Sequence, residues 1–193
     1  MRKLITILLL SCISFISYAQ ESDFYRRLST AAIELTRDKV TYDPAYYSIP
    51  YPNGDVPAGK GVCTDVVIRA YRKLGIDLQQ KMHEDMKANF SKYPTRWGMK
   101  KTDRNIDHRR VLNQQMYFSR FGIVLPISDK GSDYKPGDIV AWDLGGGITH
   151  IGIVTDRQSK DGLRPLIVHN IGRGQVLEDM IFNFKITGHY QYK

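Results

Sequence analysis

Apolar residues recur at helical spacing in two stretches of the first half of the chain. The first stretch predicts a helix capped by Ser22, with one face formed by Phe24, Leu28, Ala31 and Leu35. The second predicts a helix over residues 62–74 that ends at Gly75, with a buried face formed by Val67, Ala70, Tyr71 and Leu74. Cys63 precedes Val67 by one helical turn, so its thiol begins this buried face at the N-terminal end of the helix.

The segments on either side of the second helix are less regular. Residues 40–61 are rich in proline and glycine and predict a loop, which also carries Tyr42, Tyr46, Tyr47 and Tyr51. Tyrosines in such a loop either line a site or anchor the loop to the core, and the sequence leaves both interpretations open. Residues 76–133 predict two polar helices, near 80–92 and 107–121, separated by a loop around Trp97.

After Lys135 the pattern of apolar residues changes from helical to alternating. It predicts strands at 139–142, 149–155, 164–170, 175–178 and 185–192. Helices followed by antiparallel strands indicate an α+β fold, in which a small antiparallel sheet packs against the helix that carries Cys63.

The N-terminal residues predict export. Two cations precede an apolar run, and Ser17-Tyr18-Ala19 has the small-x-small pattern of a secretory cleavage site. We therefore expect residues 1–19 to be a cleaved signal peptide, residues 20–193 to form a single domain, and the mature protein to be periplasmic or secreted. A lipoprotein signal with Cys12 as the lipidated residue is the alternative, but the apolar run continues past Cys12 and favours ordinary cleavage.

The charge balance narrows the class of partner. The 28 Lys and Arg residues exceed the 20 Asp and Glu residues, giving a net charge of +8 at pH 7. In an exported protein, a basic surface suits acidic substrates such as cell-wall polymers. No basic run is interleaved with aromatic residues, so we expect no nucleic-acid partner. We also expect a monomer without a membrane span.

Cysteine usage points to chemistry. The chain has two cysteines, and removal of the signal peptide would leave Cys63 alone, unable to form an internal disulfide. A lone thiol in an exported protein is either inert and buried or reactive. A position in the first helical turn favours reactivity, because unpaired backbone N–H groups and the helix dipole lower the pKa of a thiol.

Two histidines can complete a nucleophilic site. His150 begins one predicted strand and His169 ends the next, and a hairpin turn near Ser159 would place them directly opposite each other. A turn two residues further on shifts the register by an even step and keeps both on one face. Gly152 leaves room beside His150. A base and a third group that orients it are what an activated cysteine requires.

A zinc site is the principal alternative for the same three side chains. Cys63, His150 and His169 are all legitimate zinc ligands, but no Cys-x-x-Cys or His-x-x-x-His spacing supports this interpretation. We therefore expect neither a metal nor another cofactor.

Three segments together resemble the NlpC-type cell-wall cysteine peptidases, a papain-like superfamily. Residues 61–76 resemble the nucleophile helix, and residues 135–154 resemble the next two strands, including Thr149-His150-Ile151-Gly152. Val168-His169-Asn170 matches the strand with the third polar residue of that family. The chain departs from the usual Asp-Cys-Ser-Gly around the nucleophile, and it resembles most a little-characterised exported branch classed as a domain of unknown function.

The resemblance implies a papain-like fold and an exported cysteine hydrolase that cleaves amide bonds in peptidoglycan stem peptides through a Cys63 thioester. His150 would be the base and His169 its orienting partner. Two alternatives stay open: a non-catalytic module that binds cell wall or glycan, and a thiol acyltransferase.

Five further residues are candidates for contacting substrate. Tyr47 or Tyr51 could help the Cys63 backbone N–H to hold the oxyanion. Asp65, in the first turn, either takes part in the site or simply complements the helix dipole. Arg173, or Lys135, could hold a substrate carboxylate.

Overall fold

The structure is a computed structural model that describes residues 23–96 and 98–193. A helix over residues 23–35 opens this part of the chain. The other α-helices are α2 (Cys63–Lys73), α3 (Leu78–Ala88) and α4 (Val111–Phe121). Three short 3-10 helices are η1 (Phe90–Lys92), η2 (Asp107–Arg109) and η3 (Gly131–Asp133).

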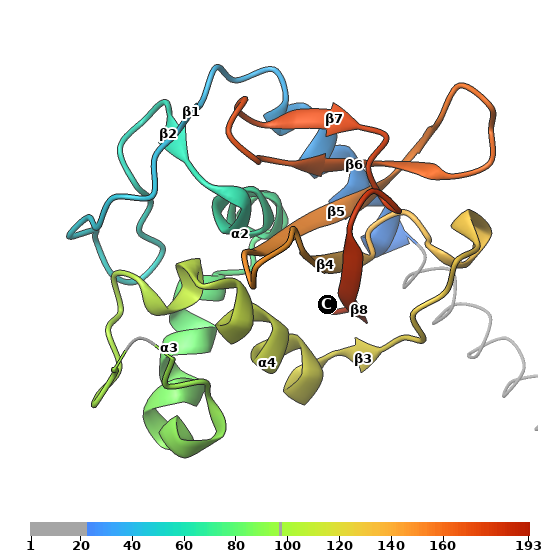
Figure 1. The fold of residues 1–193 in the computed structure, drawn as a ribbon. Helices are drawn as coiled ribbons and strands as arrows, with labels where there is room; N and C mark the ends of the chain where they lie inside the picture. The colour runs from blue at the N-terminus through green and yellow to red at the C-terminus, as the bar shows by residue number, and fades with distance from the viewer. Residues whose placement is uncertain (1–22, 97) are drawn as a thin grey trace, which may run out of the picture.

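An antiparallel sheet follows the helices, as predicted. Its strands are β3 (Ile123–Val124), β4 (Ile139–Asp143), β5 (Thr149–Gln158), β6 (Pro165–His169), β7 (Val176–Glu178) and β8 (Lys185–Gln191), in the spatial order β3-β8-β4-β5-β6-β7. A separate two-stranded parallel pair joins β1 (Thr41–Tyr42) to β2 (Lys60–Gly61). The molecule is therefore a mixed α+β structure with a small antiparallel sheet (Figure 1).

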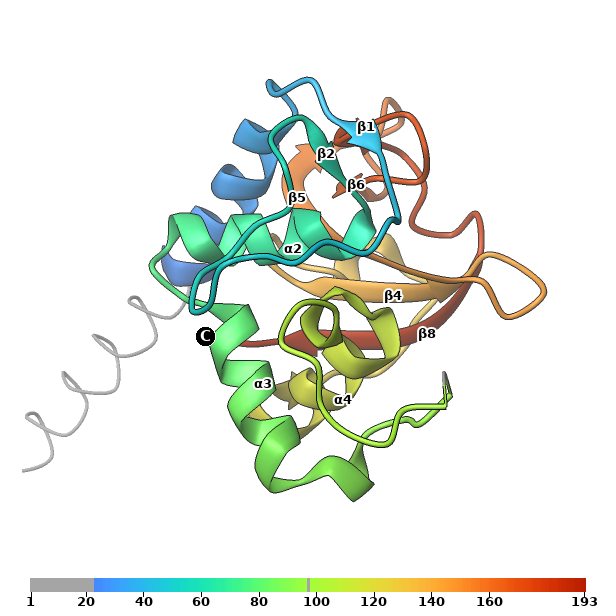
Figure 2. The same ribbon diagram turned by 90° about the vertical axis from the view of Figure 1, so that its left-hand side faces the viewer.

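Helices pack against one face of the sheet, and loops pack against the other. Ile139, Ile151, Ile153 and Val168 point to one face and form a core with the N-terminal helix, α2 and α4. Figure 2 shows α2 lying across this face, beside the N-terminal helix. The alternate residues of the same strands point to the other face, where loop residues cover them: Val140, Trp142, Val154 and Ile167 pack with Tyr134, Met180 and Ile181.

The ends of α2 are fixed by local chemistry. The Asp65 carboxylate accepts a hydrogen bond from the backbone N–H of Val62 at 2.7 Å, which caps the first turn. At the other end Gly75 has a φ of +81°, a conformation that only glycine adopts without strain. The prediction of a helix over residues 62–74 is confirmed to within one residue at each end.

The predicted hairpin register, with His150 directly opposite His169, is not the one that β5 and β6 adopt. Ile153 lies opposite Val168, so His169 falls beside Gly152 and not beside His150. A bulge between Val154 and Gln158 shifts the pairing. The shift is an even step, so both histidines stay on one face.

The middle of the chain was predicted less well. The helix expected near 80–92 begins earlier, at Leu78, because Asp77 accepts a hydrogen bond from the backbone N–H of Gln80 and caps it. The continuous helix expected at 107–121 is wrong, because Arg110 is extended and separates η2 from α4. The pairs β1–β2 and β3–β8 were not predicted, since two-residue strands carry no alternating pattern.

The predicted signal peptide at 1–19 and the cap at Ser22 lie outside the described residues. Within the residues described, no helix combines the length and apolar character needed to cross a bilayer.

Candidate active site

Four elements meet around Cys63. Gly61, the last residue of β2, leads through an extended Val62 into α2, which begins at Cys63. The Asn170 side-chain amide, directly after β6, donates to the Gly61 carbonyl at 3.1 Å. The end of β6 is thereby tied to the start of α2, and α2 also packs against β5 in the core.

The Cys63 thiol is buried, with 5% of the residue exposed. Burial raises the pKa of Cys63 to about 12, and the negative charge of Asp65 adds to this rise. Backbone N–H groups of Ile151, Thr64 and Cys63 itself act in the opposite direction, but burial has the larger effect. The helix start was predicted correctly, and its backbone N–H groups do lower the pKa of the thiol as expected, but burial outweighs them.

The start of β5 lies near the Cys63 sulfur, because the backbone N–H of Ile151 lowers the pKa of the thiol. The backbone nitrogen of Ile151 is joined directly to the carbonyl carbon of His150, and it donates toward the Cys63 sulfur. No hydrogen bond joins Cys63 to His150 themselves within the described residues. The sulfur therefore lies beside the start of β5 without being bonded to the imidazole.

His150 and His169 form a direct hydrogen bond. His150 Nε2 lies 3.0 Å from His169 Nδ1, and the rings meet edge to face. Only 2% of His150 and 1% of His169 is exposed, and Trp142 covers His150 from β4. Burial lowers the pKa of His150 to about 3, and the charge of His169 lowers it further, so the imidazole is neutral at pH 7. The predicted His150–His169 pair is brought together.

The chain of contacts continues to a carboxylate that the sequence analysis missed. His169 Nε2 lies 3.2 Å from Glu178 Oε2, and Arg173 donates to Glu178 Oε1 at 2.6 Å. Burial lowers the pKa of His169, and Glu178 partly opposes that shift. Glu178 is the last residue of the predicted strand 175–178, which follows the strand that carries His169. A carboxylate on the neighbouring strand is the sequence signal that could have identified Glu178.

The residues predicted to contact substrate have other partners. The Tyr47 hydroxyl donates to Asp43 at 2.7 Å and accepts from Lys60 at 2.9 Å. The Tyr51 ring packs against His83 and lies under the Arg104 guanidinium.

Asp65 has partners within the protein, which favours the structural interpretation of this residue. Its carboxylate is buried and forms an ion pair with Arg109 at 2.9 Å, in addition to capping α2. Arg109 also donates to the Ala45 carbonyl, so this pair ties the tyrosine-rich loop to α2. Arg173 is exposed and holds Glu178, and Lys135 Nζ donates to the Ser132 carbonyl.

Tyr42 is the tyrosine near the thiol. Burial raises its pKa, and the negative charges of Cys63 and Asp65 raise it further, which places its hydroxyl within electrostatic reach of Cys63. The raised pKa keeps Tyr42 a neutral O–H donor. The sequence identified the tyrosine-rich loop but did not single out Tyr42.

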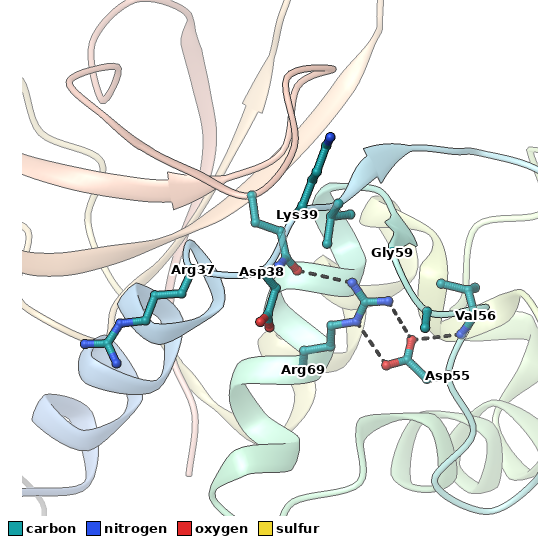
Figure 3. Close-up of a pocket in the computed structure, with 10 residues that line it drawn as sticks. Arg37, Asp38, Lys39, Asp55, Val56, Gly59 and Arg69 are labelled. Carbon is teal, nitrogen blue, oxygen red and sulfur yellow. Dashed lines mark hydrogen bonds and ion pairs between the residues drawn. The ribbon is translucent and has the colours of Figure 1, made fainter.

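Two cavities are lined by other residues. The larger, about 680 Å³, lies between the end of the N-terminal helix and α2. Figure 3 shows its most buried cation, Arg69, pointing at Asp55, with bonds of 2.9 and 3.1 Å, and a third bond joins Arg69 to Gln175. Its lining has neither cysteine nor histidine, so it does not belong to the thiol site.

The second cavity, about 500 Å³, is rich in positive charge. Its lining includes Lys101, Arg104 and Arg110 with one acid, Asp103. Asp103 already accepts hydrogen bonds from the Tyr46 hydroxyl and from the backbone of Asn105. Arg110 pairs with Asp107 at 3.6 Å, and Lys101 and Arg104 give the lining a positive character that suits an anionic group.

The geometry also bears on the zinc alternative. Within residues 23–96 and 98–193, no three His, Cys, Asp or Glu side chains gather as a metal-binding group.

Comparison with known proteins places the chain in a family. The model of the family described as Domain of unknown function (DUF1287) matches residues 29–192. The chain belongs to the DUF1287 family. It is also 53% identical over 151 residues to the uncharacterized protein YijF of Escherichia coli strain K12, a match that covers 78% of this chain and 73% of YijF. No solved structure matches.

The DUF1287 match includes every member of the site. Cys63, His150, His169 and Glu178 all lie within residues 29–192. Tyr42 and the Asp65–Arg109 pair lie within it too.

Proposed function

We propose that the protein is an exported, papain-like cysteine hydrolase that cleaves amide bonds in peptidoglycan stem peptides. The observation that carries the proposal is a helix-start thiol near the start of β5, the strand that carries one member of a buried histidine pair. Cys63 begins α2, and the N–H that follows His150 reaches its sulfur. Because His150 Nε2 is bonded to His169, Nδ1 is the nitrogen left to take a proton from the thiol.

The resting site is a neutral thiol and a neutral imidazole, so deprotonation accompanies attack. The Cys63 sulfur bonds to the substrate carbonyl carbon while its proton passes to His150 Nδ1. The imidazolium then protonates the amide nitrogen, the C–N bond breaks, and an amine and a Cys63 thioester result. His150 next takes a proton from water, whose oxygen attacks the thioester, and the released thiolate recovers the proton.

Tyr42 is the candidate oxyanion donor. Its hydroxyl is neutral and lies within electrostatic reach of Cys63, and the residue is 40% exposed, so a substrate could approach it. Together with the Cys63 backbone N–H, it would supply two donors to the developing oxyanion. This role replaces the one considered for Tyr47 and Tyr51.

The positively charged cavity is a candidate for binding the substrate's carboxylates. Stem peptides carry free carboxylates, and the basic residues first considered for them, Arg173 and Lys135, are engaged with Glu178 and Ser132. Lys101 and Arg104 line a cavity in which the single acid is already hydrogen-bonded. We assign this cavity to the anionic part of the peptide.

The test is product analysis. Mature protein is incubated with purified muropeptides in the presence of a chelator, and new amino termini are followed by mass spectrometry. We expect cleavage by the wild type, none by Cys63→Ala, and about 10²-fold or greater loss in His150→Ala. Activity that is lost to chelator and restored by zinc would replace the cysteine mechanism with a metal mechanism.

A second candidate function is a non-catalytic module that binds cell wall. The burial of Cys63 and the raised pKa of its thiol favour this candidate, because a binding module needs no thiolate. Slow alkylation of Cys63 near pH 6 is expected for either function. Binding of muropeptides without any product, unchanged in Cys63→Ala, would identify the module.

A further inference from the structure

A line of hydrogen bonds leads from His150 to the protein surface. His150 Nε2 meets His169 Nδ1 at 3.0 Å, and His169 Nε2 meets Glu178 Oε2 at 3.2 Å. The other Glu178 oxygen accepts from Arg173 at 2.6 Å. Exposure of the side chain increases along this line, from 1% at His169 to 28% at Glu178 and 75% at Arg173.

The carboxylate at the end of this line determines where each proton lies. A carboxylate only accepts hydrogen bonds, so His169 must carry its proton on Nε2 to bond to Glu178. A neutral His169 then has a bare Nδ1, which can only accept. His150 must therefore carry its proton on Nε2, and its Nδ1 is left with a lone pair.

We propose that Glu178 is a positioning residue, which acts through His169 to hold His150 in the tautomer whose Nδ1 can accept the Cys63 proton. This inference rests on the proposed function for its effect on rate. The arrangement of protons itself follows from the hydrogen bonds alone. Arg173 helps to position Glu178, because its hydrogen bond to Glu178 Oε1 leaves Glu178 Oε2 directed at His169.

Without the carboxylate, the opposite arrangement becomes available. His169 could then carry its proton on Nδ1 and donate to His150 Nε2, which would move the His150 proton to Nδ1. A protonated Nδ1 cannot accept from the thiol. Glu178→Gln changes the shape of the residue little, but its amide can donate as well as accept, so it no longer selects one arrangement.

The test reads the tautomers directly by nitrogen-15 NMR of the histidine rings in folded protein. In the wild type we expect both His150 and His169 to be protonated on Nε2. Glu178→Gln should populate the Nδ1-protonated form of His150, and Glu178→Asp, which keeps a carboxylate, should restore the wild-type pattern. Glu34→Gln is the matched control, because Glu34 pairs with Lys73 on α2 without contacting either histidine.

Turnover of muropeptides gives the second readout. Glu178→Gln should lower kcat about 10- to 100-fold with little change in KM, and Glu178→Asp should recover most of the loss. A Glu178→Gln protein with wild-type tautomers would overturn the inference. Tautomers that follow residue 178 in a protein without turnover on any muropeptide would support the inference and reject the proposed hydrolase.

Discussion

At the scale of single residues, burial determines the chemistry of the site. The sequence predicted that Cys63 begins a helix, and the backbone N–H groups of Ile151 and Thr64 do favour its thiolate. Burial has the opposite and larger effect, and it depends on the packing of α2 against β5, which no local pattern describes. The position of Cys63 at a helix start could thus be predicted from sequence, but the protonation state of its thiol could not.

Asp65 is a second residue whose burial could not be predicted from the local sequence, and here the burial affects the stability of the fold. Its side chain and that of Arg109 are 3% and 2% exposed and form a two-bond ion pair. Asp65→Asn would leave the Arg109 charge buried without its counter-ion. We expect the free energy of unfolding in urea to fall by about 3–5 kcal/mol.

Glu34→Gln is the control for that substitution. Glu34 and Lys73 form an ion pair whose side chains are 44% and 42% exposed, so its removal should change the unfolding free energy by less than about 1 kcal/mol. A loss in Asp65→Asn as small as in Glu34→Gln would show that the buried pair does not hold α2 to the tyrosine-rich loop.

At the scale of elements, the β5–β6 hairpin brings the histidines together. Alternation of apolar residues was enough to predict both strands and the face that the histidines share. It could not supply the bulge between Val154 and Gln158, because a bulge adds a residue without changing composition. The histidines are therefore offset by two residues, and Gly152 provides the space between the strands.

Gly152→Ala tests this hairpin. A methyl group there would lie 2.8 Å from Ile167 Cγ2, 2.9 Å from the Val168 carbonyl oxygen and 3.1 Å from His169 Cβ. Because the backbone cannot yield as a flexible side chain does, we expect β6 to shift away and His169 to move with it. Turnover should fall about 10- to 100-fold, and the unfolding free energy should fall by about 1–3 kcal/mol.

Gly162→Ala is the control in the same hairpin. Its methyl group would meet nothing within 4 Å, although a φ of +72° makes the substitution costly by about 1 kcal/mol. It should lower stability and leave turnover per folded molecule unchanged. Equal turnover in Gly152→Ala and wild type would contradict the role given to the spacing of the strands.

At the scale of the whole molecule, residues far apart in sequence complete the site. The α+β class could be predicted, because helical and alternating patterns occupy separate halves of the chain. The segment 76–133 carried no such clear pattern. It supplies Arg109, which pairs with Asp65 on α2, and Arg104, which lines the positively charged cavity, and both placements depend on tertiary packing.

The buried histidines predict how stability depends on pH. Burial lowers the pKa of His150 and of His108 from 6.5 to about 3, so between these values the unfolded chain binds protons that the folded chain does not. Stability should therefore fall as pH is lowered below 6.5. Asp107 opposes this in part, because burial raises its pKa from 3.8 to about 6 and stabilises the fold as pH falls through that range.

Urea unfolding at pH 7 and pH 5 measures this balance. Because two histidines destabilise the fold as pH falls and one aspartate stabilises it, we expect the urea concentration at the unfolding midpoint to be lower at pH 5 than at pH 7. His108→Gln removes one of the titrating groups and should reduce the difference between the two midpoints. A wild-type midpoint that is equal or higher at pH 5 would contradict the assignment of both histidines as buried and neutral.

The central claim is that Cys63 carries the acyl group of a cell-wall peptide. Mature protein is mixed with muropeptides, quenched in acid within a single turnover, and analysed by intact-protein and peptide mass spectrometry. We predict a covalent adduct with the mass of the acyl fragment on the peptide that contains Cys63, and no adduct in Cys63→Ala. Product formation that continues unchanged in Cys63→Ala, or an adduct at another residue, would contradict the account.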